Sequence, residues 1–162
     1  MSDRSQAPGA SLLSTWRRLR DLPGGPWLFS KILGWTVPYS GSVSPRVHLL
    51  EPGHAIVSLT ERRALRQHFG SVHAVALINI AELASGLAMT TSLPSGRRGI
   101  VTKLRIEYFK KARGVITAES QCDVSRLGID GEQEFISTCR NEAGDEVARA
   151  VVTWILGPAV KK

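Results

Sequence analysis

Cysteine is scarce in this sequence, which has two, Cys122 and Cys139, among its 162 residues. Two cysteines do not make the disulfide framework of a small secreted domain, and these two lack the spacing of metal ligands. We therefore expect both to be reduced residues of the core, and we expect no metal site. A cytoplasmic protein is the simplest expectation, because the cytosol keeps thiols reduced.

Aromatic residues are also few, at 6% of the chain, whereas the net charge is +7 and the sequence pI is about 10.0. This charge is compatible with nucleic acid, an anionic membrane surface, an acidic carrier protein or a polyphosphate cofactor as a partner. Proteins that bind single-stranded nucleic acid interleave exposed aromatic residues with lysine and arginine, and that pattern is missing here. We predict no nucleic-acid partner.

The sequence also lacks an uninterrupted apolar run that would span a membrane. Its most apolar stretch, residues 67–89, contains Asn79 and Glu82 and has His73 near its start. Ionisable side chains are costly inside a bilayer, so we predict no stable membrane insertion. With 43% hydrophobic and 22% charged residues, the composition is that of a globular domain.

The same stretch is predicted to be a helix that the rest of the chain surrounds. Apolar residues lie on nearly all of its helical faces, which is typical of a buried helix. Gly70 and Ser71 precede the run, and Ser71 is expected to cap the first free backbone N–H groups. Glu82 is unusual in such a helix. Burial of its ionised carboxylate without a partner would cost free energy or raise its pKa, so a specific role is expected for it.

Two short helices and a hairpin are expected before this helix. In the first helix, residues 11–20, an apolar face lies opposite arginines, which indicates either packing against its own domain or contact with a membrane. A second helix is expected at 27–35. The hairpin is expected at 44–60, where Val47 and Leu49 alternate with polar residues before the turn Glu51-Pro52-Gly53.

Four strands are expected after the helix, at 100–109, 115–124, 134–140 and 146–156. In the first of them, alternation places Ile100 and Leu104 on one side of a half-buried strand. The whole order predicts an α+β fold in which a curved antiparallel sheet of about six strands wraps around one long helix.

Three motifs in this layout resemble a known family. The pattern Asn-His-x-Gly-Ser/Thr-Val-His-Gly-Gly, with an acidic residue nine positions after the last His, resembles residues 67–75, QHFGSVHAV, with Glu82. The pattern Thr-x-x-x-x-x-Phe-Leu-Arg-Pro-Ala-x-Gly resembles residues 102–114. An acidic glycine turn followed by alanine and threonine resembles residues 141–153. Over residues 43–156 the chain thus resembles the hotdog-fold acyl-CoA thioesterase superfamily, in particular its phenylacetate-pathway and 4-hydroxybenzoyl-CoA thioesterase branch.

The two short helices predict a helical N-terminal extension at residues 1–40, which the resemblance does not cover, and the resemblance implies a single hotdog domain at 41–162. It also implies a homodimer or a dimer of dimers with a continuous sheet and active sites at the subunit boundary. The partner would be a thioester of CoA or of an acyl carrier protein, with no cofactor besides the CoA of the substrate.

The resemblance further implies general-base attack of water on a thioester. Glu82 takes the position of the base, and backbone N–H groups at the helix start polarise the carbonyl. The candidate catalytic residues are Glu82, His73 and Asn79. The candidate substrate-binding residues are Gln67, His68, Gly70, Ala74, Val75, Thr102, Lys110 and Arg113.

Structural roles remain open for the same residues. Glu82 is either this base or a buried acid paired with an arginine of a neighbouring subunit, and His73 either takes part in catalysis or fixes its loop. Lys110 and Arg113 either bind the CoA phosphates or form a solvated turn. The alternative function is a non-catalytic module that binds acyl-CoA or acyl carrier protein. A dehydratase is disfavoured, because no histidine follows Glu82.

Overall fold

A computed structural model describes residues 9–159 of the chain. Three helices come first: α1 (Ala10–Leu19), α2 (Gly25–Thr36) and α3 (Pro38–Gly41). The hairpin strands β1 (Arg46–Glu51) and β2 (His54–Thr60) and the short helix η1 (Arg63–Leu65) lead to the long helix α4 (Ala74–Thr90). The remaining elements are β3 (Arg97–Tyr108), β4 (Val115–Gln121), η2 (Val124–Arg126), β5 (Gly131–Arg140) and β6 (Glu146–Pro158).

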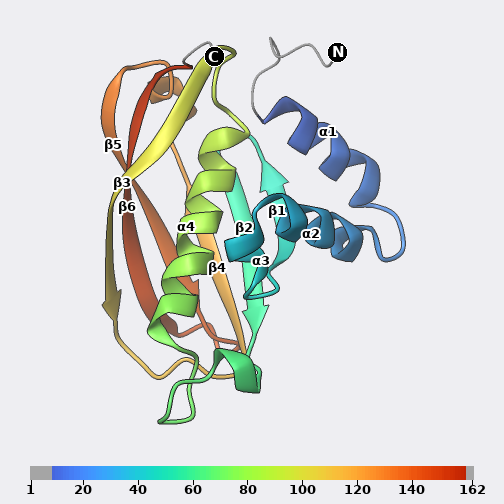
Figure 1. Cartoon of the computed structure of the whole chain (residues 1–162), viewed down its shortest axis with the longest axis vertical. Coiled ribbons are helices and arrows are strands. Elements are labelled where there is room, and N and C mark those ends of the chain that lie inside the picture. The colour runs from blue at the N-terminus through green and yellow to red at the C-terminus, as the bar shows by residue number, and fades with distance from the viewer. Residues whose placement is uncertain (1–8, 160–162) are drawn as a thin grey trace.

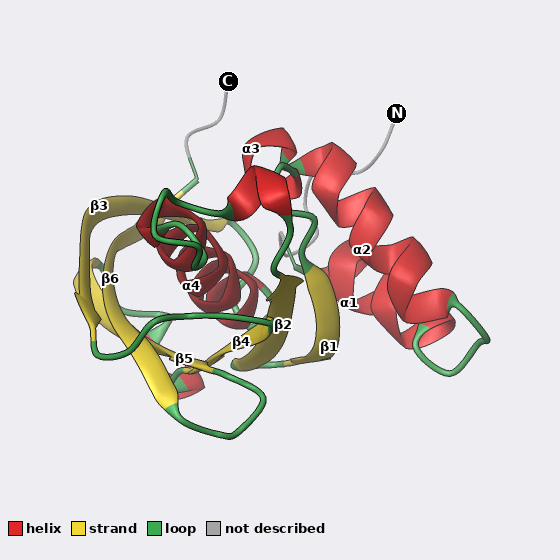
Figure 2. Ribbon diagram, turned by 90° about the horizontal axis from the view of Figure 1, so that it is seen from below, coloured by secondary structure: helices red, strands yellow, loops and turns green. Residues whose placement is uncertain are grey.

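The six strands form one antiparallel sheet in the order β1-β2-β4-β5-β6-β3. The sheet curls around α4, which lies against its concave side (Figures 1 and 2). The layout predicted from the sequence, a curved sheet around one apolar helix, is confirmed.

Helix α4 is buried as its composition indicates, with Ile80, Ala81 and Ala84 fully enclosed. It begins at Ala74, however, and its N-cap is His73, whose side chain accepts the Val75 N–H. The prediction that Ser71 caps the helix was therefore wrong. Gly70 adopts a left-handed φ of 71°, and the resulting turn places the start of the helix beyond Ser71.

The predicted hairpin around residues 51–53 is confirmed, but its alternation contains an irregularity. The pairing of β1 with β2 shifts between Val47 and Leu49. As a result Leu50 is buried, whereas Leu49 is only half-buried. A bulge of this kind breaks the period of two on which the prediction depended.

Strand β3 pairs with β6 on one side and forms an edge of the sheet on the other. A second irregularity lies between Val101 and Lys103. Val101 and Ile106 pack against the core, whereas Ile100 is 48% exposed. The prediction that Ile100 and Leu104 share one half-buried face was wrong, because the bulge turns Ile100 away from the core.

The opposite edge strand, β1, is covered by α1 and α2 (Figure 2). Trp16 of α1 and Phe29 of α2 are buried, with their ring centroids 5.1 Å apart in an edge-to-face arrangement. The prediction that the first helix packs against its own domain is confirmed. The division into an extension and a hotdog domain at residue 40 stays a prediction, and its first eight residues lie outside the described part.

Both cysteines are free thiols, Cys139 buried and Cys122 half-buried. Burial raises the pKa of Cys139 to about 12 and that of Cys122 to about 11, so both are poor nucleophiles. Over residues 9–159, no helix combines the length and the apolar character that crossing a bilayer requires.

Candidate functional site

Three polar residues interrupt the apolar surface of α4, and one of them is fully satisfied by the fold. Ser85 donates a hydrogen bond to the Glu82 carbonyl at 2.8 Å and accepts one from the Trp154 indole at 3.2 Å. Gly86 leaves room for the same indole, since a Cβ there would lie 3.3 Å from the Trp154 ring. Ser85 is therefore structural, and Asn79 and Glu82 remain to be explained.

Asn79 is buried and only partly satisfied. Its Nδ2 donates to the Tyr39 carbonyl across a long distance of 3.5 Å. Its Oδ1 is buried and has no hydrogen-bond partner among residues 9–159. A buried acceptor without a partner is costly, and such groups are often found where a ligand or a water binds.

Glu82 lies one turn further along the same face of α4 and is half-buried. Within the part of the chain that the structure describes, its carboxylate has neither a hydrogen-bond donor nor a cation. Burial raises the pKa of Glu82 above its ordinary value, and no neighbouring charge offsets this. A carboxylate in this environment is a stronger proton acceptor than an exposed one once it is ionised.

A cavity of about 310 Å³ opens in front of Asn79 and Glu82. Its remaining walls are apolar or come from the N-terminal segment: Val75 and Ile78 of α4, Val101 and Leu104 of β3, and Tyr39 and Ser40. The bulge in β3 explains why Val101 and Leu104, three residues apart, both face this cavity.

A second cavity, of about 330 Å³, also includes Glu82 in its wall. It follows α4 through Leu83 and Gly86 to Thr90 and is covered by α1 and α2. The α4 residues of both cavities lie at helical spacing on one face, and Glu82 is where the two meet. The structure thus places an unpaired carboxylate between two largely apolar spaces.

The start of α4 differs from what the sequence indicates. The Val75 N–H is occupied, because it donates to His73 Nδ1 at 3.1 Å. His73 therefore caps the helix, and its ring lines a different cavity from the one in front of Glu82. Ala74 also lines that other cavity, and its carbonyl accepts a hydrogen bond from the Tyr108 hydroxyl at 3.1 Å.

This other cavity, of about 480 Å³, is formed by the loop before α4 and the segment after β3. Gln67 closes the loop, since its Nε2 donates to Ser71 Oγ and its Oε1 accepts the Phe69 N–H, both at 2.7 Å. His68 lies exposed against the Phe69 ring. Lys110 and Lys111 supply positive charge on the far side.

The remaining predicted substrate-binding residues do not lie in the cavity of Glu82. Lys110 is paired with Asp145 at 2.9 Å. Thr102 donates to Glu132 Oε1 at 3.0 Å and does not line the cavity of Glu82. Arg113 lies near Glu61, whose pKa is lowered first by the Gly114 N–H and then by Arg66 and Arg113. One chain therefore brings together Glu82, Asn79 and Val75, and separately Gln67, His68, His73, Ala74 and Lys110.

Tyr39 and Ser40 are among the residues of the Glu82 cavity that sequence reasoning missed. They lie more than thirty residues before α4 and carry no recognisable motif, so only the path of the chain through α3 identifies them. The tryptophans of the N-terminal segment, Trp16, Trp27 and Trp35, do not line either cavity of Glu82. Trp16 belongs to the core, and the other two are exposed.

No metal-binding arrangement accompanies the site. Among residues 9–159, no three His, Cys, Asp or Glu side chains lie close enough together to bind an ion.

Comparison with known proteins supplies the family. The domain of unknown function DUF4442 matches residues 25–156. The structural-genomics protein APC5556 has 31% sequence identity and a TM-score of 0.80, over 93% of this chain and 100% of its own. PA5026 of Pseudomonas aeruginosa, described as a probable thioesterase, has 24% identity and a TM-score of 0.74, over 85% and 97% of the two chains.

A further similar structure, smu.793 of Streptococcus mutans, was solved bound to acetyl CoA. It has 22% identity and a TM-score of 0.60, over 71% of this chain and 90% of its own. No curated protein sequence matches the chain. The chain therefore belongs to the DUF4442 family and has the hotdog fold of the thioesterase superfamily that its motifs resemble.

Proposed function

We propose that this protein is a hydrolase of acyl thioesters in which Glu82 is the general base. The observation that carries the proposal is the Glu82 carboxylate, which is half-buried and has no partner among residues 9–159, at the point where two largely apolar cavities meet. Fold similarity to a probable thioesterase and to a protein bound to acetyl CoA supports the class of substrate. Because a fold does not by itself determine which reaction a protein catalyses, the proposal depends mainly on the Glu82 carboxylate.

The reaction balances with water as the only co-substrate. The ionised Glu82 carboxylate removes a proton from a water molecule as its oxygen attacks the thioester carbonyl carbon. The tetrahedral intermediate collapses, the carbon–sulfur bond breaks, and the thiolate takes up the proton to leave as a thiol. The free acid is the second product.

Asn79 is placed to position the water. Asn79 lines the same cavity as Glu82, and its Oδ1 is a buried acceptor without a partner among residues 9–159. A water molecule that donates one proton to this oxygen has its other proton free for Glu82. The two residues are three positions apart on α4 and therefore neighbours on one face.

The cavity that extends from Glu82 to Thr90 is suited to an acyl chain. Leu12, Leu33, Leu83 and Leu87 make it predominantly apolar. Glu82 and Thr90 are eight residues apart on one helix, which gives a length of about 12 Å, room for roughly eight to ten methylene carbons. We therefore place a medium-length aliphatic acyl group beneath the N-terminal helices.

Polarisation of the carbonyl requires a second chain in this proposal. The Val75 N–H is occupied by His73, and Ala74 lies in the other cavity. The outer edge of β3 has no partner strand among residues 9–159, and β3 carries exposed apolar side chains, including Leu104 and Tyr108. Pairing of two β3 edges about a two-fold axis would form a homodimer, directly or as half of a dimer of dimers, with sites at the boundary.

The thiol portion of the substrate, CoA or an acyl carrier protein, would approach from the side of the basic residues. Lys111 and Arg113 are exposed in the segment after β3, which forms one side of the cavity at the start of α4. Lys110 is paired with Asp145 and would have to release it in order to bind a phosphate. Phosphates are good partners for such side chains.

A thioester panel with the purified protein tests the proposal. We expect hydrolysis of acyl-CoAs, highest for chains of medium length and weaker for acetyl-CoA, followed by release of the free thiol. Calorimetric titration of the same thioesters is the companion measurement. Binding without turnover would overturn the hydrolase and leave the alternative, a module that binds acyl-CoA or acyl carrier protein.

A further inference from the structure

The outer face of α2 is apolar although it faces solvent. Trp27, Leu28, Ile32 and Trp35 are 55%, 44%, 45% and 91% exposed, respectively. They lie on one side of the helix, and Phe29 and Leu33 on the opposite side are buried in the core. A helix that is apolar on both sides is expected to be covered on both sides, by protein or by lipid.

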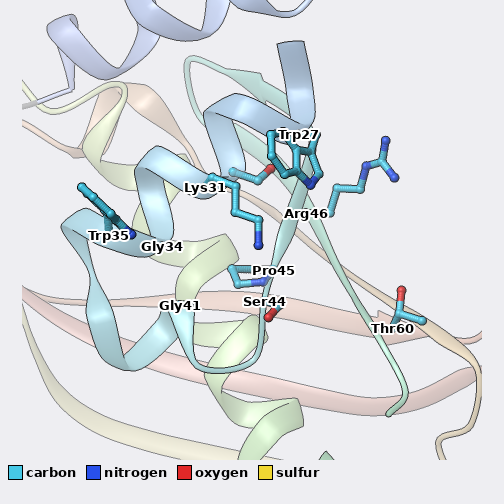
Figure 3. A pocket seen from close by; sticks show the side chains of 10 residues that line it. Trp27, Lys31, Gly34, Trp35, Gly41, Ser44, Pro45, Arg46 and Thr60 are labelled. Carbon is cyan, nitrogen blue, oxygen red and sulfur yellow. The ribbon is translucent and has the colours of Figure 1, made fainter. Parts of the chain in front are cut away.

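The α2 face has a basic border. Lys31 lies between Trp27 and Trp35 on the same side of the helix, with its Nζ 5.7 Å from the centre of the Trp27 ring. Figure 3 shows Trp27, Lys31 and Arg46 around one pocket of about 310 Å³, with Trp35 at its margin. The preceding helix α1 carries the exposed Arg17 and Arg18 in its last turn.

The charge balance of this part of the chain is one-sided. Over residues 9–43, four basic side chains, Arg17, Arg18, Arg20 and Lys31, are accompanied by one acidic side chain, Asp21, which is paired with Arg20. An apolar face with tryptophans and a basic border complements an anionic bilayer surface, where indole rings lie at the level of the headgroups.

We propose that the outer face of α2 docks the folded protein onto anionic phospholipid membranes. The residues that enter the headgroup region are Trp27, Leu28, Ile32 and Trp35, while Lys31 and Arg46 contact lipid phosphates. The face lies beside β1, on the side of the molecule away from β3, so docking leaves the proposed dimer edge free (Figure 2). The helix keeps its buried side in the core, and the fold need not open.

Tryptophan emission reports this docking directly. The chain has four tryptophans, of which Trp16 and Trp154 are buried, so a change of emission on adding vesicles arises from Trp27 and Trp35. With the full chain and vesicles of phosphatidylcholine and phosphatidylglycerol, we expect a blue shift and co-sedimentation. Vesicles of phosphatidylcholine alone are expected to bind at least about tenfold more weakly.

Two variants and a matched control define the contact. Trp35→Ser is expected to weaken vesicle binding by about tenfold or more, and Lys31→Glu to weaken it and reduce its dependence on salt. Ile129→Ser removes an exposed apolar side chain, 58% accessible, from the turn before β5 and is expected to leave vesicle binding unchanged.

Three results would overturn the proposal. The first is the absence of binding to the anionic vesicles, and the second is equal binding by Trp35→Ser and by Ile129→Ser. The third is self-association that Trp35→Ser abolishes without any vesicle binding, which would assign the α2 face to a second copy of the chain.

Discussion

Replacing Glu82 by glutamine is expected to lower kcat for thioester hydrolysis by about 10²–10⁴-fold, the usual contribution of a general base. Glutamine has nearly the same shape but does not accept a proton from water. KM is expected to change little, because the cavities on both sides of Glu82 keep their apolar walls. Steady-state kinetics with a medium-chain acyl-CoA measures both parameters.

The variant is expected to remain folded. Because burial raises the pKa of Glu82, its ionised form at pH 8 destabilises the native state relative to the protonated form at low pH. Glutamine removes that cost, so the Tm of the variant at pH 8 should be no lower than that of the wild type. Glu134→Gln, on an exposed position of β5, is the matched control and should retain full activity. Full activity of Glu82→Gln would exclude Glu82 as the base.

Replacing Leu12 by tryptophan is expected to shorten the acyl chains that the protein accepts. Leu12 is a half-buried residue of α1 in the wall of the cavity that runs from Glu82 to Thr90. A larger ring there reduces the space for distal carbons, and each lost methylene contact in such a pocket is worth about 10-fold or more. We expect kcat/KM to fall by about 10–100-fold for decanoyl-CoA and longer chains, and to stay near the wild-type value for acetyl-CoA.

Ser14→Trp is the control for this experiment. It adds the same ring to the same helix at an exposed position that does not line the cavity. An unchanged chain-length profile for Leu12→Trp, or the same shift for both variants, would show that the acyl group does not lie beneath the N-terminal helices.

The architecture could be predicted because it follows from local patterns. The apolar faces of α4 and the glycine-containing turns between strands are properties of short segments, and both were found in the structure. Errors occurred where a bulge changed the alternation, as at Leu49 and Ile100. A bulge depends on the partner strand, which alternation within one strand does not reveal.

The candidate site was predictable only in its central residue. Glu82 is conspicuous in the sequence because a carboxylate is unfavourable in a helix that is otherwise apolar on nearly all faces. Ser85 is equally conspicuous, but its role depends on Trp154, a residue of the last strand. The contribution of Tyr39 and Ser40 depends on how the N-terminal helices cross over α4, and the occupation of the Val75 N–H depends on the side-chain rotamer of His73. Such contacts over long sequence distances have no local signal.

The most direct test of the account is the pH dependence of kcat/KM for thioester hydrolysis, which reports the ionisation of the free enzyme. Because the base must be ionised to accept a proton, the rate is expected to rise with pH through a single ionisation. Burial places its midpoint above the ordinary pKa of glutamate. A midpoint at or below the ordinary pKa of glutamate would contradict the role of Glu82. So would a value of kcat/KM that does not change with pH around and above that pKa.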